Sequence, residues 1–338
     1  SYSLIAYDDR SEEGRRAGLH ALLVTAGGGL VMLAGFVVLG IEGGTYSISA
    51  LAAAPPTGTA ATVGLGLVLA GIATKSAQFP FHGWLPSAMA APTPASAFLH
   101  AATMVKAGVF LAIRLHPVAA GDGVWETGLL VLGLATMAVG GWAALRETDL
   151  KRILAYGTVA QLGLLTALVA RDVSLAAGAA LLLAHAGFKA ALFLVVGAVD
   201  KSTGTRDVRV LTGLRHSLPF LFWVAIAAAA SMAGVPATLG FVAKEAALDL
   251  LLKEDPATAW LIGAASVLTV AYTLRVVRVF LGKPWGGAAH PLPALTTGPA
   301  ALLAAAGVLL GTFTAPVSRL TDAVAAASGV PAVPLPAW

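Results

Sequence analysis

The sequence predicts an all-α protein, a polytopic membrane bundle of helices, and three features support this fold class. Hydrophobic residues make up 58% of the 338 positions and charged residues only 11%, and the mean hydropathy is +0.84. Apolar runs of about 20 residues, the length that crosses a bilayer, recur along the chain. Lysine and arginine also gather in alternate loops. A soluble domain does not combine these features.

The apolar runs end at charged or Pro/Gly-rich breaks and indicate about nine spans in one membrane domain, 1–338. Residues 1–7 run into the charged stretch DDRSEEGRR, so we expect the tail of a truncated helix and a chain that is a fragment of a longer polypeptide. The spans are expected at 17–40, 60–79 with a broken continuation to 91, 94–115, 126–145, 153–170, 173–199, 217–252 with an internal break, 257–281 and 297–316. Residues 317–338 are expected to be an extramembrane tail.

The basic residues give an orientation. If successive spans cross the membrane in alternate directions, most of the basic residues fall on one side. They lie in the loops with Arg10, Arg15 and Arg16, with Arg146, Lys151 and Arg152, with Lys201, Arg206, Arg209 and Arg215, and with Lys283. The opposite loops hold Arg171, Lys253 and Arg319, and Arg114 lies at a span end. Since cytoplasmic loops are enriched in Lys and Arg, the loops Arg10–Arg16, Arg146–Arg152 and Lys201–Arg215 are predicted to be cytoplasmic, and the protein to lie in the cell membrane.

Two of the spans carry helix breakers near their middles. The first has Pro80, five residues after Lys75, and the second has Gly234 and Pro236 before Lys244. Proline and glycine interrupt a helix and free backbone groups that need polar partners. Paired interrupted segments in two halves of a chain indicate the ion site of a transporter, although a simple proline kink is the alternative.

Ionisable side chains inside spans are the main functional signal. Lys75, Lys106, Lys189 and Lys244 lie in predicted spans, with His100, His185 and Glu245 near them. A charge at mid-bilayer costs about 2.5 to more than 10 kcal/mol, depending on the scale. Burial disfavours the charged form of a lysine amine and can lower its pKa to near neutral pH. Histidine already titrates near neutral pH. The pattern therefore predicts a proton path.

Spacing places these side chains relative to one another. On a regular helix, His100 and Lys106 would point about 120° apart and differ by about 9 Å in height. His185 and Lys189 are four residues apart and share a face. The alternatives are a snorkelling Lys75, histidines that only hydrogen-bond a neighbouring helix, and an interfacial turn that holds Lys244 and Glu245.

Other site classes have little support. The chain has no cysteine, which excludes disulfides, Cys-bound zinc and Cys-ligated iron–sulfur clusters. There is no Walker sequence and no GxGxxG after a strand, so no cofactor is predicted. The basic residues lie in short loops, which does not suggest nucleic acid. Carboxylates suited to hard cations are rare in the spans, Glu245 apart, so the sequence locates no sodium or other metal site.

Four stretches carry a family resemblance. They are ATKSAQFPFHGWLPSAMAAPTPASAFLHAATMVKAG, DLKRILAYGTVAQLG, HAGFKAALFLVVGAVD and AGVPATLGFVAKE. In order and spacing they resemble the antiporter-like membrane subunits of respiratory complex I and of Mrp-type multisubunit Na+/H+ antiporters. The stretch VGAVDKSTGTRDVRVLTGL, the lysine at Lys106 and the opening of the chain are more similar to the A subunits of the Mrp antiporters.

The resemblance implies two inverted five-helix repeats, each with a discontinuous helix, and a polar axis at mid-membrane. Lys75 and Lys244 match the lysines of the two broken helices. His100 and Lys106 match the bridging helix, His185 and Lys189 the central helix, and Lys151 the basic residue at the start of the preceding helix. The family's key glutamate would lie before Ser1. Leu181, Gly157 and Ala160 depart from polar residues common in the family.

The resemblance also implies a function. The first interpretation is the proton-conducting subunit of a monovalent cation (Na+)/proton antiporter, a secondary transporter and not an enzyme, with other integral membrane subunits as partners. The alternative is a membrane-arm subunit of a complex I-like oxidoreductase or membrane-bound hydrogenase. A third interpretation is a membrane subunit of an inorganic-carbon uptake complex.

Overall fold

The computed structural model describes residues 2–7 and 11–335, which form helices and connecting loops without a β-strand. An isolated bridge between Asp149 and Asp207 is the only β-type pairing in these residues. The predicted all-α fold class is confirmed. Ser1, Arg10 and residues 336–338, which the sequence assigns to a helix tail, a basic loop and the C-terminal tail, lie outside the described residues.

The helices follow the predicted spans closely. Seven stretches of the described residues are long and apolar enough to cross a membrane: α2 (Glu12–Glu42), Thr93–Ala119, α8 (Gly123–Arg146), α9 (Leu150–Val169), α10 (Asp172–Thr203), α13 (Pro256–Arg278) and α14 (Ala294–Thr312). Two shorter apolar helices are α4 (Thr59–Lys75) and α11 (Pro219–Ala233). The remaining α-helices are α1 (Tyr2–Ile5), α3 (Ile48–Ala53), α5 (Trp84–Ser87), α6 (Thr93–Ala97), α7 (Lys106–Ala119), α12 (Leu239–Glu254) and α15 (Ala315–Ser328).

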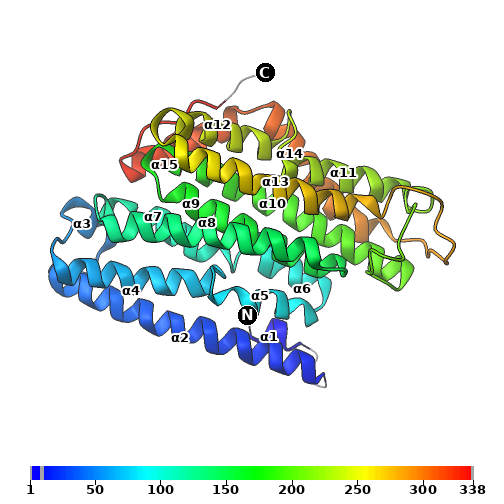
Figure 1. The fold of residues 1–338 in the computed structure, drawn as a ribbon, viewed down its shortest axis with the longest axis horizontal. Helices are drawn as coiled ribbons and strands as arrows, with labels where there is room; N and C mark the ends of the chain where they lie inside the picture. The colour runs from blue at the N-terminus through cyan, green and yellow to red at the C-terminus, as the bar shows by residue number, and fades with distance from the viewer. Residues whose placement is uncertain (1, 8–10, 336–338) are drawn as a thin grey trace.

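Helix α10 forms the centre of the bundle. It packs against α9, α11, α12 and α14, while α8 packs on α9 and α2 on α4 (Figure 1). In Figure 1 the α2–α4 pair lies along one edge, and α12 and α15 lie at the other. Because α10 is covered on several sides, polar side chains on it are removed from lipid, which positions the candidate site.

The first predicted break is present and is held by hydrogen bonds. Helix α4 ends at Lys75, and the chain continues through a turn into short 3-10 and α-helical pieces. Ser76 Oγ donates to Val105 O at 2.7 Å, and Phe79 N donates to Thr136 Oγ1 at 2.8 Å. Backbone groups freed by the break are therefore satisfied inside the protein, as a membrane interior requires.

The second predicted break separates α11 from α12. Gly234 ends α11 in the left-handed region at φ +85°, where a glycine carries no steric penalty. Thr238 begins α12, and its hydroxyl accepts a hydrogen bond from Phe241 N. The two discontinuous helices of the predicted fold class thus lie in the two halves of the chain.

Two features differ from the sequence analysis. The span 94–115 is not one regular helix: Phe98–Ala102 forms a π-helical turn, and α7 begins only at Lys106. The predicted 120° and 9 Å between His100 and Lys106 assume a uniform helix, and the structure contradicts that assumption. The expected C-terminal tail also contains α15, a 14-residue helix that packs against α10 and α7.

Asp255 joins two helix ends on the side opposite the basic loops. Its carboxylate accepts hydrogen bonds from Thr258 N at 3.2 Å and Thr258 Oγ1 at 2.7 Å, at the start of α13. Arg171 Nε, beside the start of α10, donates to it at 3.0 Å. The hydrogen bonds from Thr258, followed by the charge of Arg171, lower the pKa of Asp255.

We expect Asp255→Ala to lower the free energy of unfolding by about 1–2 kcal/mol at pH 7, the typical cost of losing a helix cap. A lowered folded-state pKa stabilises the fold above the unfolded-state value, about 3.9, and this contribution disappears as pH falls through the folded-state pKa. Denaturant unfolding at pH 7 and pH 3 checks this, with Asp249→Ala as an exposed control. An equal loss at both pH values would contradict it.

Candidate functional site

Six basic side chains from four parts of the fold form a polar seam inside the bundle. The seam consists of His100, Lys106, Lys151, His185, Lys189 and Lys244. His100 interacts electrostatically with Lys106, Lys151 and Lys189. His185 interacts with His100, Lys106, Lys189 and Lys244. The structure therefore brings together the central helix, the bridging helix, the start of α9 and the second broken helix.

Lys189 lies at the centre of this seam. Its side chain is fully buried, and its Nζ donates to Leu154 O at 3.2 Å. The same atom lies 5.7 Å from the centroid of the Tyr272 ring, within the range of a cation–π interaction. No carboxylate lies within 4 Å of Lys189 Nζ in the described residues, so carbonyl and aromatic groups provide its polar surroundings.

Three seam residues carry buried nitrogens without a hydrogen-bond partner. Both ring nitrogens of His100, both of His185 and Nζ of Lys106 are unpaired among the described residues. Buried polar groups are rarely left unpaired, and ordered water is the usual partner where protein groups do not reach. These five nitrogens therefore mark positions where water molecules can bridge the seam.

Lys151 connects the seam to the first broken segment. Its side chain is 2% exposed, and its Nζ donates to Met89 O at 3.1 Å and to Ala91 O at 2.7 Å. These carbonyls lie where the chain leaves regular helix before Pro92. The Lys151 ammonium thus binds two backbone carbonyl groups at a point where the regular helix is interrupted.

Lys75 and Lys244 are less enclosed than predicted. Both side chains are half-buried. Lys244 Nζ donates to Met232 O at 2.8 Å and so links the two halves of the second break. Lys75 makes no hydrogen bond or ion pair with the described residues. The structure places Lys75 at the first break but outside the seam.

Glu245 is not brought to the seam. It is exposed on α12 while its neighbour Lys244 turns inward, because adjacent helical residues point about 100° apart. A role for Glu245 in proton transfer stays a prediction.

Tyr272 of α13 is a seam neighbour that the sequence analysis missed. Its hydroxyl donates to Gly157 O at 3.3 Å, and Gln161 Nε2 donates to the Tyr272 hydroxyl at 3.3 Å and to Thr269 Oγ1 at 3.1 Å. Tyr272 is fully buried. A lone tyrosine in an apolar span resembles an interfacial anchor, so only the departure at Gly157 from a polar residue common in the family could have pointed to it.

Gly157 makes room for this arrangement. A Cβ added there would lie 2.8 Å from Tyr272 Cε2 and 3.1 Å from Lys189 Nζ. We expect Gly157→Ala to destabilise the protein by about 1–3 kcal/mol through overpacking, and addition of Tyr272→Leu to recover part of the loss. Thermal unfolding of the purified protein measures both variants. Gly66→Ala, where nothing lies within 4 Å of the added Cβ, is the control, and equal effects at both glycines would contradict the expectation.

Comparison with known proteins places the chain in a family. Residues 1–269 match the family model described as "NADH:quinone oxidoreductase/Mrp antiporter, TM". The chain belongs to the NADH:quinone oxidoreductase/Mrp antiporter family. The A/B subunit of a probable K(+)/H(+) antiporter of Rhizobium meliloti (strain 1021) is 44% identical in an alignment of length 300 that covers 84% of this chain and 30% of that protein. The A subunit of the Na(+)/H(+) antiporter of Alkalihalophilus pseudofirmus is 41% identical in an alignment of length 311 that covers 83% of this chain and 39% of that protein.

Solved structures of the NADH:quinone oxidoreductase/Mrp antiporter family share the fold. The Mrp complex from Dietzia sp. DQ12-45-1b gives a TM-score of 0.88 at 36% identity over 99% of this chain and 38% of the matched chain. Respiratory complex I from Thermus thermophilus gives a TM-score of 0.88 at 28% identity, covering 97% and 72%. The predicted resemblance and fold class are confirmed, and this chain spans 30% to 39% of the length of the antiporter relatives.

Proposed function

We propose that this chain is the proton-conducting part of a multisubunit monovalent cation/proton antiporter in the cell membrane. The observation that carries the proposal is the group of electrostatically interacting bases inside the bundle, which extends from the buried Lys151 beside the first broken segment to the half-buried Lys244 at the second. Intramembrane bases grouped in this way mark proton relays.

A proton relay needs groups that exchange protons over short steps. The seam contains both amines and imidazoles, and its unpaired nitrogens at His100, His185 and Lys106 are positions for bridging water. Protons would move along this route between the side of the basic loops and the opposite side. Sodium is the first candidate for the exchanged cation, and other membrane subunits would complete its route, because the seam has no carboxylate.

The relatives favour antiport over redox pumping. Two of them are named as subunits of cation/proton antiporters, one for K+ and one for Na+. The structural likeness to complex I keeps a membrane-arm subunit of a redox enzyme as the second candidate. In that case the same seam would be driven by electron transfer in other subunits.

Everted membrane vesicles that contain the whole assembly test the proposal. A proton gradient is formed without NADH, and Na+ or K+ is then added while the internal pH is followed with a fluorescent amine. We expect one of these cations to dissipate the gradient without an electron donor. Proton movement that requires NADH or another donor, with no response to either cation, would support the redox alternative and overturn antiport.

A further inference from the structure

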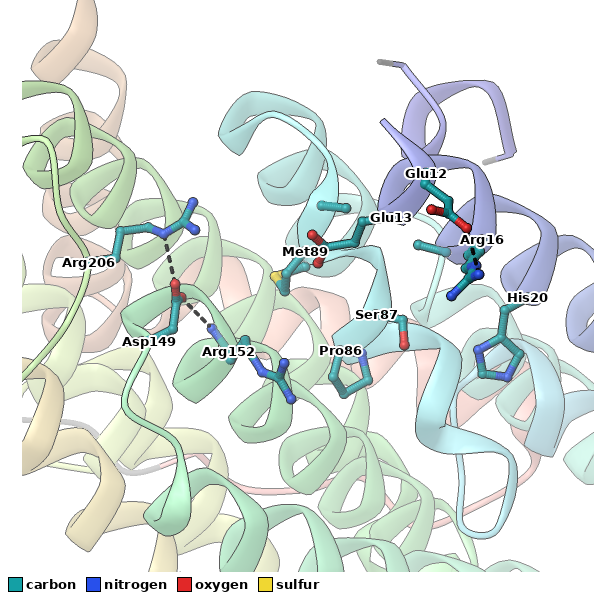
Figure 2. Close-up of a pocket in the computed structure, with 12 residues that line it drawn as sticks. Glu12, Glu13, Arg16, His20, Pro86, Ser87, Met89, Asp149, Arg152 and Arg206 are labelled. Carbon is teal, nitrogen blue, oxygen red and sulfur yellow. Dashed lines mark hydrogen bonds and ion pairs between the residues drawn. The ribbon is translucent and has the colours of Figure 1, made fainter. Parts of the chain in front are cut away.

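A water-accessible hollow reaches the seam from the side of the basic loops. It has a volume of about 400 Å³, and its lining includes Glu13, Met89, Ala91, Thr93, Lys151 and Asp200. A larger hollow of about 670 Å³ shares Glu13, Met89 and Arg206 with it and is shown in Figure 2. The two hollows share part of their lining and lie between α2 and the buried amine of Lys151.

Lys151 separates this hollow from the rest of the seam. Its Nζ is held by two carbonyls of the broken segment, and it interacts electrostatically with His100. No carboxylate lies within 4 Å of Lys151 Nζ among the described residues. Since Lys151 lines the hollow, water in the hollow can exchange a proton with its amine.

Most of the carboxylates around the two hollows are already paired. Arg206 binds Asp149 at 2.9 Å and Asp200 at 3.3 Å. Glu12 pairs with Arg16 at 2.6 Å, as Figure 2 shows. Such pairing favours the ionised form of a carboxylate and makes these groups poor carriers of a proton.

Glu13 differs from these carboxylates. It lines both hollows and forms no ion pair or hydrogen bond with the described residues. The charged and titratable groups that face the hollows with it are Glu12, Arg16 and His20 from α2, Asp149, Lys151 and Arg152 from the start of α9, and Asp200 and Arg206 from the end of α10 and the loop after it.

We propose that the hollow is the proton port of the seam, with Glu13 as the carboxylate that exchanges protons between water and Lys151. In each exchange the Glu13 carboxylate takes one proton and passes it on, directly or through water, or the same step runs in reverse. This inference rests on the proposed proton path and adds the place where that path meets water.

Glu13→Gln in the intact antiporter tests the port, with Glu12→Gln as the matched control. Positioned acid–base groups accelerate proton transfer by about 10²–10⁴-fold in enzymes, so we expect turnover to fall about tenfold or more in Glu13→Gln, with little change in the KM for the cation. Glu12→Gln should stay near the unmodified rate. High concentrations of a small weak acid such as formic acid should restore part of the lost rate.

The outcomes separate this inference from the proposed function. Normal turnover in Glu13→Gln, together with loss of transport in Lys189→Ala, would overturn the port and leave the proton path standing. A loss in Glu13→Gln that weak acid does not restore, or an equal loss in Glu12→Gln, would indicate a structural role and also overturn it. Normal turnover in both Glu13→Gln and Lys189→Ala would contradict the proposed function itself.

Discussion

Replacing Lys189 with alanine is expected to abolish cation/proton exchange while leaving the protein folded and assembled. Lys189 lies at the centre of the seam, where its amine interacts with Lys106 and Lys244 and with both seam histidines. Removing the amine takes away the group that interacts electrostatically with four of the other five seam bases, His100, Lys106, His185 and Lys244. The proton would then have to pass through His185, whose ring nitrogens have no hydrogen-bond partner among the described residues, and through water.

The structural cost of this change is expected to be small compared with its effect on transport. The acceptor of Lys189, Leu154 O, also accepts a hydrogen bond from Thr158 Oγ1 at 2.8 Å, so it stays paired in the variant. The shortened side chain leaves space for water rather than an unpaired buried charge. Amounts of assembled complex should therefore stay near those of the unmodified protein.

Antiport in vesicles at matched amounts of complex measures the result. Lys253→Ala is the control, because Lys253 is exposed and pairs with Asp249 one helical turn away at 2.7 Å, and surface pairs of this kind contribute little. Lys189→Arg is a second variant for the same assay. It tests whether proton release is needed, because arginine keeps the charge but does not release its proton near neutral pH. Exchange above a tenth of the unmodified rate in Lys189→Ala would refute its role.

The sequence predicted the helices and the breaks well because both depend on local chemistry. Runs of apolar residues define the spans, and Pro80 and Gly234 mark the interruptions. Boundaries differ from the prediction by a few residues, as at α10, which the sequence placed at 173–199 and which extends over Asp172–Thr203. Polar residues at helix ends are compatible with either loop or helix, so apolar runs alone do not fix them.

The arrangement of the seam was less predictable because it depends on contacts between distant segments. The partner carbonyls of Lys151, Met89 O and Ala91 O, lie about 60 positions earlier in the chain and have no signature in the sequence. A π-helical turn around His100 replaces a regular helix. It contains no proline or glycine from which the irregularity could have been predicted. Tyr272 and Glu245 show the same limit: whether a side chain points inward is decided by tertiary packing.

The second large effect is expected at Lys75, whose replacement by alanine should also abolish exchange although the residue lies outside the seam. Lys75 ends α4 at the first break, where the negative end of the helix dipole attracts a positive charge. The carbonyls of the last turn are satisfied without it, since Ile72 O, Ala73 O and Thr74 O accept from Ser76 N, Gln78 N and Trp84 Nε1. The amine is therefore not needed to hold the break.

From this geometry we expect Lys75→Ala to affect transport without affecting folding. Lys75→Ala should assemble and unfold like the unmodified protein, because no hydrogen bond within the described residues is lost, yet exchange in vesicles should fall to background. Lys75→Arg should also be inactive if proton release is required, and active if only the positive charge matters. Near-normal exchange in Lys75→Ala would show that the half-buried lysine is an interfacial side chain, and that the proton path runs through the seam without reaching the first break at this point.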